Sequence, residues 1–398
     1  MRLAKRLAGI STSPTMAVMQ EAQRLRAQGI DVIDLGSGEP DFPTPDVIKE
    51  SGIKAIRENF TKYTAGAGIQ ELRQAVADKF NKQWGTDFTV ENVIITCGAK
   101  HAIFSVCMTL FEEGDDVLLP VPCWVTFPEV IKMTGAVPQQ FVTPEEQGFV
   151  IQTEEVEKNL TAATKGLIIN TPSNPTGAVV PGEIIEELAE LARRKNVFLL
   201  FDETYDYFTY GDRSHVSLAS FVGVSDKFFA IVGSMSKTYS MTGWRIGFCL
   251  SHRDVIKKMS QFQSHQTGNP TSISQRAALS ALNSPSEIVS EMRKEYEVRR
   301  QFVLQALESI PGFTCVPPDG AFYAFPNVSQ CMWKMGIESS NDFARFLIQE
   351  ARVSTVPGSA FGMEGYIRIS YATSLENLEE AFSRIQSAIT SAHVRNLP

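Results

Sequence analysis

Short apolar runs alternate with amphipathic stretches through the middle of the chain. The runs 166–170 (GLIIN), 197–201 (VFLLF) and 228–233 (FFAIVG) have no polar face, whereas 181–196 (PGEIIEELAELARRKN) places apolar residues at helical spacing. Strands that are apolar on both faces are typical of a parallel sheet covered by helices on both sides. The pattern therefore predicts an α/β domain with a mostly parallel sheet. Further runs of the same kind are 92–96, 116–120 and 244–251.

The pattern changes near residue 284. A long charged helical pattern at 285–310 is followed by strand-like stretches at 312–328 and 366–374. No stretch has the composition of a flexible linker, so we expect the two parts to be joined by regular structure. We predict a large domain over 46–283 and a smaller α+β domain formed by 1–45 together with 284–398.

Composition and charge exclude several classes of protein. The chain has 398 residues and a net charge of −8, so it has no basic surface of the kind that binds nucleic acid or anionic membranes. It contains no apolar run long enough to span a bilayer. The six cysteines are scattered and form no CxxC pair, which argues against a metal site and favours reduced thiols in a cytoplasmic protein.

Polar residues gather after the apolar runs, where a parallel sheet presents the carboxyl ends of its strands to ligands. Lys237 follows the run 228–233. Burial lowers the pKa of an amine and makes it a nucleophile, but Lys237 taken alone fits a solvated side chain better. Ser234 and Arg245 favour the first interpretation, because a hydroxyl, a guanidinium and an amine together suit a phosphate ester beside a carbonyl.

Three further clusters add groups of the same kind. Gly98 and Ala99 (in TCGAKH) lie between a strand and a helix, where backbone N–H groups bind anions. Asp202 ends an apolar run and needs a cationic partner if it is buried; Tyr205 follows it, and Asn174 lies in the turn NTPSNPTG. Each cluster alone also fits an ordinary turn or ion pair. Together they supply what pyridoxal 5′-phosphate requires.

In these motifs the chain resembles the fold-type I, pyridoxal-phosphate-dependent aminotransferases of classes I and II. The stretch 234–248 (SMSKTYSMTGWRIGF) is similar to their lysine signature. Their other blocks are similar to NTPSNPTG, DETY, GSGEPDFPTP and YTAGAGIQELRQAV. The resemblance covers practically the whole chain. It implies the fold of that family, with a seven-stranded, mostly parallel sheet in a large domain and a smaller α+β domain.

The resemblance implies a role for each residue that faces the cofactor. Lys237 would carry the cofactor as a Schiff base and move the substrate proton. Asp202 would keep the ring nitrogen protonated, Tyr205 and Asn174 would donate to the phenolic oxygen, and Trp124 would stack on the ring. The residues implied to hold the phosphate are Gly98, Ala99, Lys100, Ser234 and Arg245.

Other residues are implied to bind the substrate. Arg368 (in GYIRISYATS) would hold the α-carboxylate in its planar fork. Gly38 would bring its backbone close to the substrate, which Trp124 and Asn174 would also contact. Tyr63 matches a tyrosine that reaches the cofactor phosphate of the partner subunit, which implies a homodimer with shared active sites.

The choice of amino donor depends on the group that binds a distal carboxylate. One aspartate aminotransferase subgroup uses an arginine in a segment that matches 261–275 (QFQSHQTGNPTSISQ), which contains none here. A second subgroup, Ib, has a lysine and a threonine where this chain has Lys100 and Thr15. The resemblance thus favours L-aspartate and 2-oxoglutarate as substrates and oxaloacetate and L-glutamate as products, in a ping-pong mechanism that alternates pyridoxal and pyridoxamine phosphate.

Other activities stay open. The runner-up is an aminotransferase of broad, alanine, aromatic or prephenate specificity; prephenate users tend to have a basic residue near the position of Ser11. A pyridoxal-phosphate-dependent C–S lyase is a less favoured reading of the same motifs. We do not expect a non-catalytic regulator, because such proteins normally carry a helix-turn-helix domain ahead of this fold.

Overall fold

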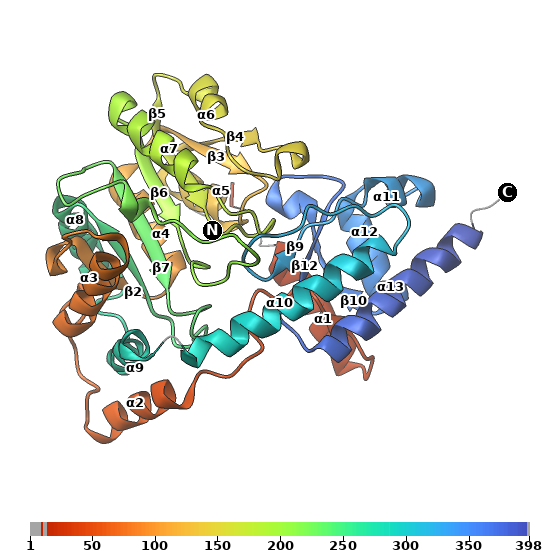
Figure 1. Ribbon diagram of the computed structural model, residues 1–398, viewed down its shortest axis with the longest axis horizontal. Coiled ribbons are helices and arrows are strands. Elements are labelled where there is room, and N and C mark those ends of the chain that lie inside the picture. Colours follow the sequence, from red (N-terminus) through yellow and green to blue (C-terminus); the bar gives the residue numbers. More distant parts are fainter. Residues whose placement is uncertain (1–8, 11–13, 286, 396–398) are drawn as a thin grey trace, which may run out of the picture.

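The computed structural model describes residues 9–10, 14–285 and 287–395, without the side chains of 14–19 and 393–395. A seven-stranded sheet organises the larger part of the molecule (Figure 1), with the strand order β2-β8-β7-β6-β5-β3-β4. β8 is antiparallel to both of its neighbours, and every other pairing in this sheet is parallel. Its strands are Val93–Thr96 (β2), Asp116–Val121 (β3), Val137–Val142 (β4), Thr164–Asn170 (β5), Phe198–Asp202 (β6), Phe229–Ser234 (β7) and Gly247–Ser251 (β8).

Helices cover both faces of this sheet, which explains why its central strands are apolar throughout. In β5, Leu167 and Ile169 pack into one buried cluster, whereas Ile168 between them packs into another. The first cluster includes residues of Asp46–Arg57 (α2), Gln70–Trp84 (α3), Thr153–Asn159 (α6), Gly182–Lys195 (α7) and Ser272–Asn283 (α9). The second includes residues of Ala99–Leu110 (α4), Thr126–Thr134 (α5) and Arg253–Gln266 (α8). The predicted α/β fold with a mostly parallel sheet is confirmed.

Two details of the sheet differ from the sequence prediction. The edge strand β4 was not predicted, because its sequence VPQQFV mixes polar with apolar residues and it is largely exposed. The strand predicted at 244–251 begins only at Gly247. Arg245 has a φ of +54°, a left-handed conformation that a strand residue does not adopt. The bend places Arg245 just before the strand.

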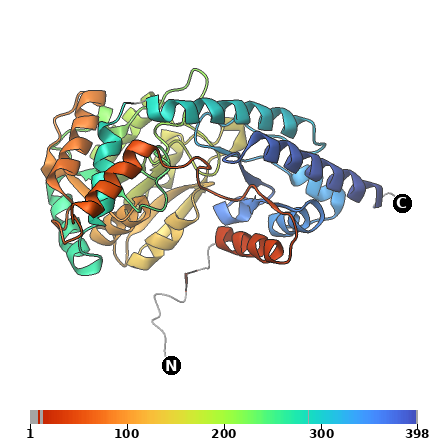
Figure 2. The ribbon, with the colours of Figure 1, turned by 90° about the horizontal axis from the view of Figure 1, so that it is seen from below.

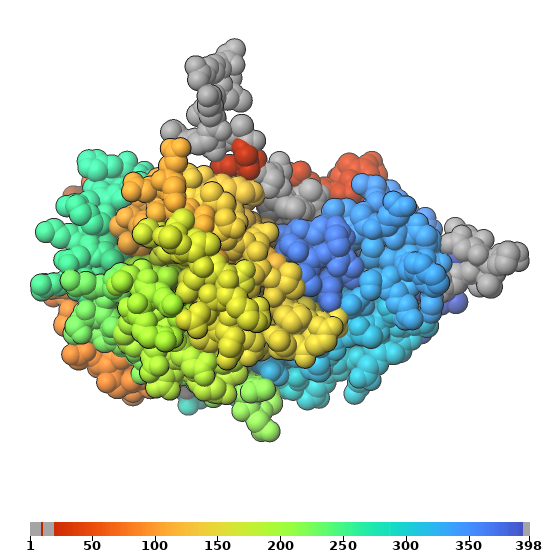
Figure 3. Space-filling model, turned by 90° about the horizontal axis from the view of Figure 1, so that it is seen from above, coloured from red at the N-terminus to blue at the C-terminus, as the bar shows by residue number. Residues whose placement is uncertain are grey.

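A second group of elements lies at the other end of the molecule (Figures 2 and 3). β1 pairs in parallel with β10, while β11, β12 and β9 form an antiparallel sheet. These strands are Ile33–Asp34 (β1), Tyr323–Ala324 (β9), Val353–Ser354 (β10), Val356–Pro357 (β11) and Ile367–Ser370 (β12). The helices are Pro14–Ala27 (α1), Glu287–Glu308 (α10), Ser329–Met335 (α11), Ser340–Phe346 (α12) and Leu375–Arg395 (α13). The division at residues 46 and 283 stays a prediction.

Aromatic residues fill the core of this second part. Tyr296 of α10, Phe322, Tyr323 of β9 and Tyr371 are all fully buried in one cluster. The cluster also takes in Tyr205 and Phe208, which follow β6 of the large sheet. The two parts therefore meet through the aromatic residues beside the carboxyl end of β6.

The state of the cysteines and the length of the helices both bear on what the composition predicts. All six cysteines are free thiols, and four of them are buried. Burial raises the pKa of the Cys107 and Cys123 thiols to about 12, so both stay protonated at neutral pH. Within the described part of the chain, no helix has the length and apolarity needed to cross a membrane.

Candidate active site

A cavity of about 310 Å³ lies at the carboxyl ends of the strands in the large sheet. Three of the large-sheet strands, β5, β6 and β7, end at residues that line it, and the helix α4 that follows β2 contributes its first two residues. Most of the residues predicted for the site meet here, although they come from distant parts of the sequence. The cavity is lined by Gly38, Ala99, Lys100, Trp124, Val125, Thr126, Asn170, Asn174, Asp202, Thr204, Tyr205, Ser234, Ser236, Lys237, Thr242, Arg245, Tyr323 and Arg368.

Lys237 brings an amine into this cavity. Its Nζ donates to the backbone carbonyl of Gly38 and lies 5.9 Å from the ring centre of Phe322. Burial lowers the pKa of Lys237 to about 8, with the charge of Glu39 opposing the shift and the charges of Arg368 and Arg245 adding to it. A sizeable fraction of the amine is therefore unprotonated near neutral pH, as a nucleophile or base must be.

Asp202 is the last residue of β6 and is 4% exposed. Its Oδ1 accepts hydrogen bonds from the backbone N–H of Thr204 at 3.0 Å and from the Thr204 hydroxyl at 2.5 Å. Burial raises the pKa of the carboxyl to about 6. The cationic partner expected from the sequence is not a neighbouring side chain; instead Asp202 faces the cavity, where a protonated ring nitrogen would complete the pair.

The start of α4 and Arg245 form a cradle for an anion. Gly98 has a φ of +87°, and a Cβ there would lie 2.3 Å from Nη2 of Arg245, so a side chain would displace the guanidinium. Arg245 donates to the carbonyls of Thr242 and Cys97. Ser234 lies beside them and accepts from the N–H of Ser236 at 3.0 Å. Backbone N–H groups at the start of a helix, a guanidinium and hydroxyls suit a phosphate.

Arg368 lies on β12 and is 2% exposed. It donates to Oδ1 of Asn174 at 2.9 Å and to the carbonyl of Gly36 at 2.7 Å, but its Nε has no hydrogen-bond partner among the described residues. A buried guanidinium with an unused N–H is ready for an anionic ligand, since leaving it unpaired costs free energy. Because Oδ1 of Asn174 accepts from Arg368, its amide N–H₂ is available to donate into the cavity.

Lys100 and Trp124 form a second polar corner of the cavity. Nζ of Lys100 lies 5.1 Å from the centre of the Trp124 ring. Burial of the ammonium, followed by the charge of Arg245, lowers the pKa of Lys100. Besides Lys237 and Arg245, the cavity lining thus contains two cationic groups, Lys100 and Arg368.

Three predicted residues are not among those that line this cavity. Gly98 is one of them, but it lies directly against Arg245, which does line it. Tyr63 lies in the loop between α2 and α3 and is 96% exposed, so it reaches no part of its own chain's site. Thr15 belongs to α1, and its side chain lies outside the described residues, as does Ser11. The structure leaves their predicted roles as predictions.

The lining residues that were not predicted as site residues include Thr204, Asn170 and Tyr323, which hold other residues of the site. Thr204 holds Asp202; Asn170 accepts from the N–H of Asn174 at 2.8 Å and donates to the carbonyl of Asp202 at 2.9 Å; and the Tyr323 hydroxyl lies 2.8 Å from that of Tyr205. Thr204 and Asn170 sit in motifs that were already singled out. Tyr323 is separated from Tyr205 by 118 positions, and its stretch reads as a core strand.

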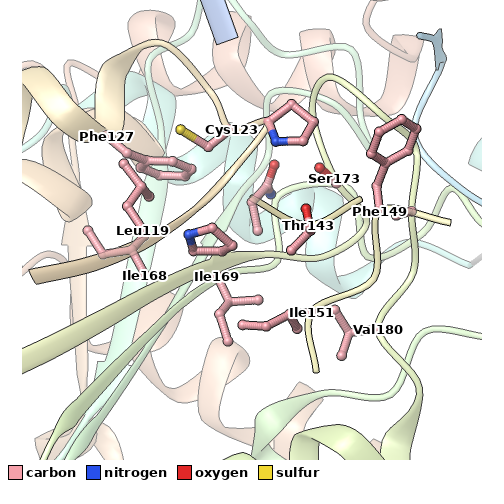
Figure 4. Close-up of a pocket in the computed structure, with 14 residues that line it drawn as sticks. Leu119, Cys123, Phe127, Thr143, Phe149, Ile151, Ile168, Ile169, Ser173 and Val180 are labelled. Atoms are coloured by element: carbon pink, nitrogen blue, oxygen red, sulfur yellow. The ribbon is translucent and has the colours of Figure 1, made fainter. Parts of the chain in front are cut away.

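A smaller internal cavity of about 40 Å³ lies on the other side of Asn170 (Figure 4). Its walls are mainly apolar side chains such as Phe149 and Ile151, with Thr143 and Ser173 among them. The Thr143 hydroxyl donates a hydrogen bond to the carbonyl of Val121 at 3.0 Å. The Cys123 thiol also lines this space, but burial raises its pKa to about 12, so it stays protonated.

The sequence profile of one protein family, described as aminotransferase class I and II, matches residues 30–385. The chain belongs to this family. An aspartate aminotransferase of Geobacillus stearothermophilus is 43% identical over 97% of this chain and 98% of its own. A probable aspartate/prephenate aminotransferase of Aquifex aeolicus is also 43% identical, with the same coverage. The structure of an aspartate aminotransferase from Thermus thermophilus with maleate matches with a TM-score of 0.92 and 38% identity over 98% of this chain and all of that one.

Pyridoxal 5′-phosphate is the cofactor of this aminotransferase family, and the cavity fits it. The fit rests on three observations: the lowered pKa of the Lys237 amine, the bare Gly98 beside Arg245, and the Asp202 carboxylate that faces the cavity without a cationic side-chain partner. These groups would supply a carbonyl-reactive amine, an anion cradle and a partner for a ring nitrogen. The sequence-based expectation of a pyridoxal-phosphate-dependent aminotransferase is confirmed.

Proposed function

We propose that this aminotransferase transfers the amino group of L-aspartate to 2-oxoglutarate. The observation that carries the proposal is the presence of the Lys237 amine together with two cationic groups, Arg368 and Lys100, in the lining of a single cavity. An amino acid with two carboxylates matches two such groups. The names of the Geobacillus and Thermus relatives support the same donor.

The roles of the chain's own groups follow from their positions. The guanidinium of Arg368 binds the α-carboxylate, and the ammonium of Lys100 binds the distal one. The amine of Lys237, freed from the cofactor by the substrate, takes the proton from the substrate Cα as a base and then delivers it, as an acid, to carbon C4′ of the cofactor. Asp202 holds the proton on the ring nitrogen, while Asn174 and Tyr205 donate to the phenolic oxygen. When bound, the cofactor supplies the electron sink that makes the Cα proton acidic.

A panel of amino donors tests this function. The purified holoprotein is incubated with 2-oxoglutarate and each of aspartate, alanine, phenylalanine and cysteine, and the oxo acids and glutamate are quantified. We expect aspartate to give the highest kcat/KM. Release of ammonia and pyruvate without glutamate would instead identify a C–S lyase. A preference for alanine or phenylalanine would reject the proposed donor.

Prephenate is a second candidate acceptor. The Aquifex relative, which matches this chain as well as the Geobacillus enzyme does, is named for both aspartate and prephenate. Prephenate has two carboxylates, so it meets the same requirement for two cationic groups. Replacing 2-oxoglutarate by prephenate in the aspartate assay, and measuring oxaloacetate, decides whether it is used.

Lys100→Ala is predicted to discriminate between donors. Removing the ammonium takes away the partner of the distal carboxylate, which alanine lacks. We expect KM for aspartate to rise by about tenfold, the equivalent of about 1.4 kcal/mol for one charged hydrogen bond, and KM for alanine to change less than about twofold. Lys132→Ala on α5 is the control, since that lysine pairs with Glu129 away from the cavity. Equal effects on both donors would reject this role for Lys100.

We further propose that two copies of the chain share their active sites. Tyr63 is 96% exposed, and the neighbouring helix α2 leaves Ile56 and Val47 about half exposed. Aromatic and aliphatic side chains that are this exposed at one edge are suited to burial against a second copy. In a symmetric dimer, Tyr63 of each copy would reach the phosphate cradle of the other.

Mixed dimers test the shared site. Tyr63→Ala and Lys237→Ala are each expected to be weakly active or inactive alone. A mixture refolded together is expected to regain about a quarter of wild-type activity, because half of the dimers are mixed and each then has one intact site. The molecular mass in solution is measured alongside by light scattering. A monomer, or a mixture with no regain, would contradict the shared site.

A further inference from the structure

The hydroxyls of Tyr205 and Tyr323 form a buried pair at the cavity wall. Their oxygens lie 2.8 Å apart, and the rings meet edge to face with centres 5.7 Å apart. Tyr205 is 5% exposed and Tyr323 is fully buried. Burial raises the pKa of both hydroxyls, so each keeps its proton at neutral pH.

Two further contacts hold Tyr323 in place. The guanidinium carbon of Arg368 lies 4.4 Å from the centre of its ring, a cation–π distance. Gly38 approaches its hydroxyl from the other side, because a Cβ at Gly38 would lie 2.9 Å from the Tyr323 oxygen. Tyr323 thus joins the guanidinium, the Gly38 backbone and Tyr205 within one cavity.

Counting protons fixes what the pair can do. Each hydroxyl has one proton, and the bond between the two oxygens uses one of the two. The pair therefore has one proton left to donate into the cavity. If the Tyr205 hydroxyl donates its proton to a ligand, the Tyr205 oxygen has to accept the proton of the Tyr323 hydroxyl. Among the described residues, the Tyr323 hydroxyl has no other hydrogen-bond partner.

We propose that Tyr323 is a positioning residue for Tyr205: its hydroxyl donates to the Tyr205 oxygen and thereby directs the Tyr205 proton to the phenolic oxygen of the cofactor. The inference rests on the proposed function, which places that oxygen opposite Tyr205. A hydroxyl that accepts a hydrogen bond is a stronger donor, because hydrogen bonds in a chain polarise one another. Tyr323 acts through Tyr205 and needs no contact with the reacting atoms.

The consequence is visible in the light absorption of the bound cofactor. A hydrogen-bond donor to the phenolic oxygen stabilises the negative charge on that oxygen. This lowers the pKa of the neighbouring nitrogen, the one through which Lys237 would bind the cofactor. Without substrate, the absorption changes with pH as this nitrogen loses its proton. A weaker donor leaves the proton more tightly held, so the midpoint of the change moves to higher pH.

The test is a spectroscopic titration of the holoprotein without substrate, in a double-mutant cycle. Tyr205→Phe is expected to raise the midpoint by about 1 to 2 pH units, the value of a hydrogen bond to a charged oxygen. Tyr323→Phe is expected to raise it by about half a unit, the share due to polarisation. In a protein that already has Tyr205→Phe, adding Tyr323→Phe is expected to move the midpoint by less than about 0.2 pH unit, because the Tyr205 hydroxyl through which Tyr323 acts is absent.

Tyr371→Phe is the matched control. Tyr371 is also fully buried, and its hydroxyl donates to the carbonyl of Ala321 at 3.4 Å. It is not among the residues that line the cavity. Its loss is expected to leave the midpoint unchanged. An unshifted midpoint in Tyr323→Phe, or a shift of the same size with and without Tyr205, would overturn the proposal. A wild-type protein that binds no cofactor would instead count against the proposed function.

A second variant keeps the test valid if Tyr323→Phe folds poorly. Gly38→Ala would push the Tyr323 hydroxyl off Tyr205 while leaving both tyrosines in place. It is expected to raise the midpoint in the same direction, and to have no effect when Tyr205 is phenylalanine. Thermal unfolding of the cofactor-free proteins shows whether each variant is folded. A folded Gly38→Ala protein with an unshifted midpoint would also reject the proposal.

Discussion

Lys237→Ala is expected to lower kcat for aspartate by roughly 10⁴-fold or more, the largest effect of any single substitution considered for this protein. The reason is that one buried amine is given two tasks, bonding to the cofactor and moving the Cα proton. Its pKa of about 8 suits both. In the described part of the cavity lining, Lys100 is the other lysine, and it lies over Trp124 at the opposite corner. The measurement is steady-state kinetics of the cofactor-loaded variant.

Lys227→Ala provides the control for a lost lysine. Lys227 is exposed and lies just before β7, so its removal is expected to change kcat by less than about twofold. The absorption spectrum offers an independent check, since Lys237→Ala cannot link the cofactor to the protein. Turnover within tenfold of wild type would show that another group carries the reaction.

Arg368→Lys is expected to lower kcat/KM by roughly 100-fold for every amino donor. The substitution keeps the charge but removes the planar fork that can bind a carboxylate with two N–H groups. Losing one hydrogen bond to a charged group costs up to about 3 kcal/mol, equivalent to roughly two orders of magnitude. Every amino acid has an α-carboxylate, so aspartate and alanine are expected to suffer alike, in contrast to the selective effect of Lys100→Ala.

The Arg368 variant needs a control for stability. Arg368 also donates to Asn174 and to the carbonyl of Gly36, so its loss is expected to lower the unfolding midpoint by a few degrees. The Arg345 side chain on α12 is 64% exposed. Arg345→Lys therefore measures how much the same substitution changes the unfolding midpoint at a surface position. A loss of kcat/KM that differs by more than tenfold between the two donors would contradict binding of the α-carboxylate.

The central strands were predictable because helices bury both faces and leave continuous apolar runs. Edge elements were not: β4 has one neighbour and exposed residues such as Val137 and Val142, so its sequence has no strong period. The start of β8 was placed too early because the sequence WRIGF reads as a strand, whereas the backbone turns at Arg245. The left-handed conformation of Arg245 accompanies the contacts that its side chain makes with the carbonyls of Thr242 and Cys97, which the local sequence does not reveal.

The site was predictable where its residues lie within short motifs. Lys237, Asp202 and Asn174 each follow a strand, and the ends of parallel strands meet at one edge of the sheet. Tyr323 was not predictable, because its contact with Tyr205 is made across the second part of the molecule and leaves no local pattern. The unused Nε of Arg368 and the position of Gly38 against Tyr323 likewise exist only in three dimensions.

The acceptors that Arg368 and Lys237 use on the N-terminal segment are both main-chain carbonyls, those of Gly36 and Gly38. No side-chain replacement can delete a carbonyl of the backbone. The acceptors that position Arg368 and Lys237 are therefore out of reach of side-chain substitution, whereas the contact between Lys100 and Trp124 is made by side chains alone. Anyone wishing to give this enzyme a new amino donor should randomise the Lys100 end, and can expect recognition of the α-carboxylate to be retained in most variants.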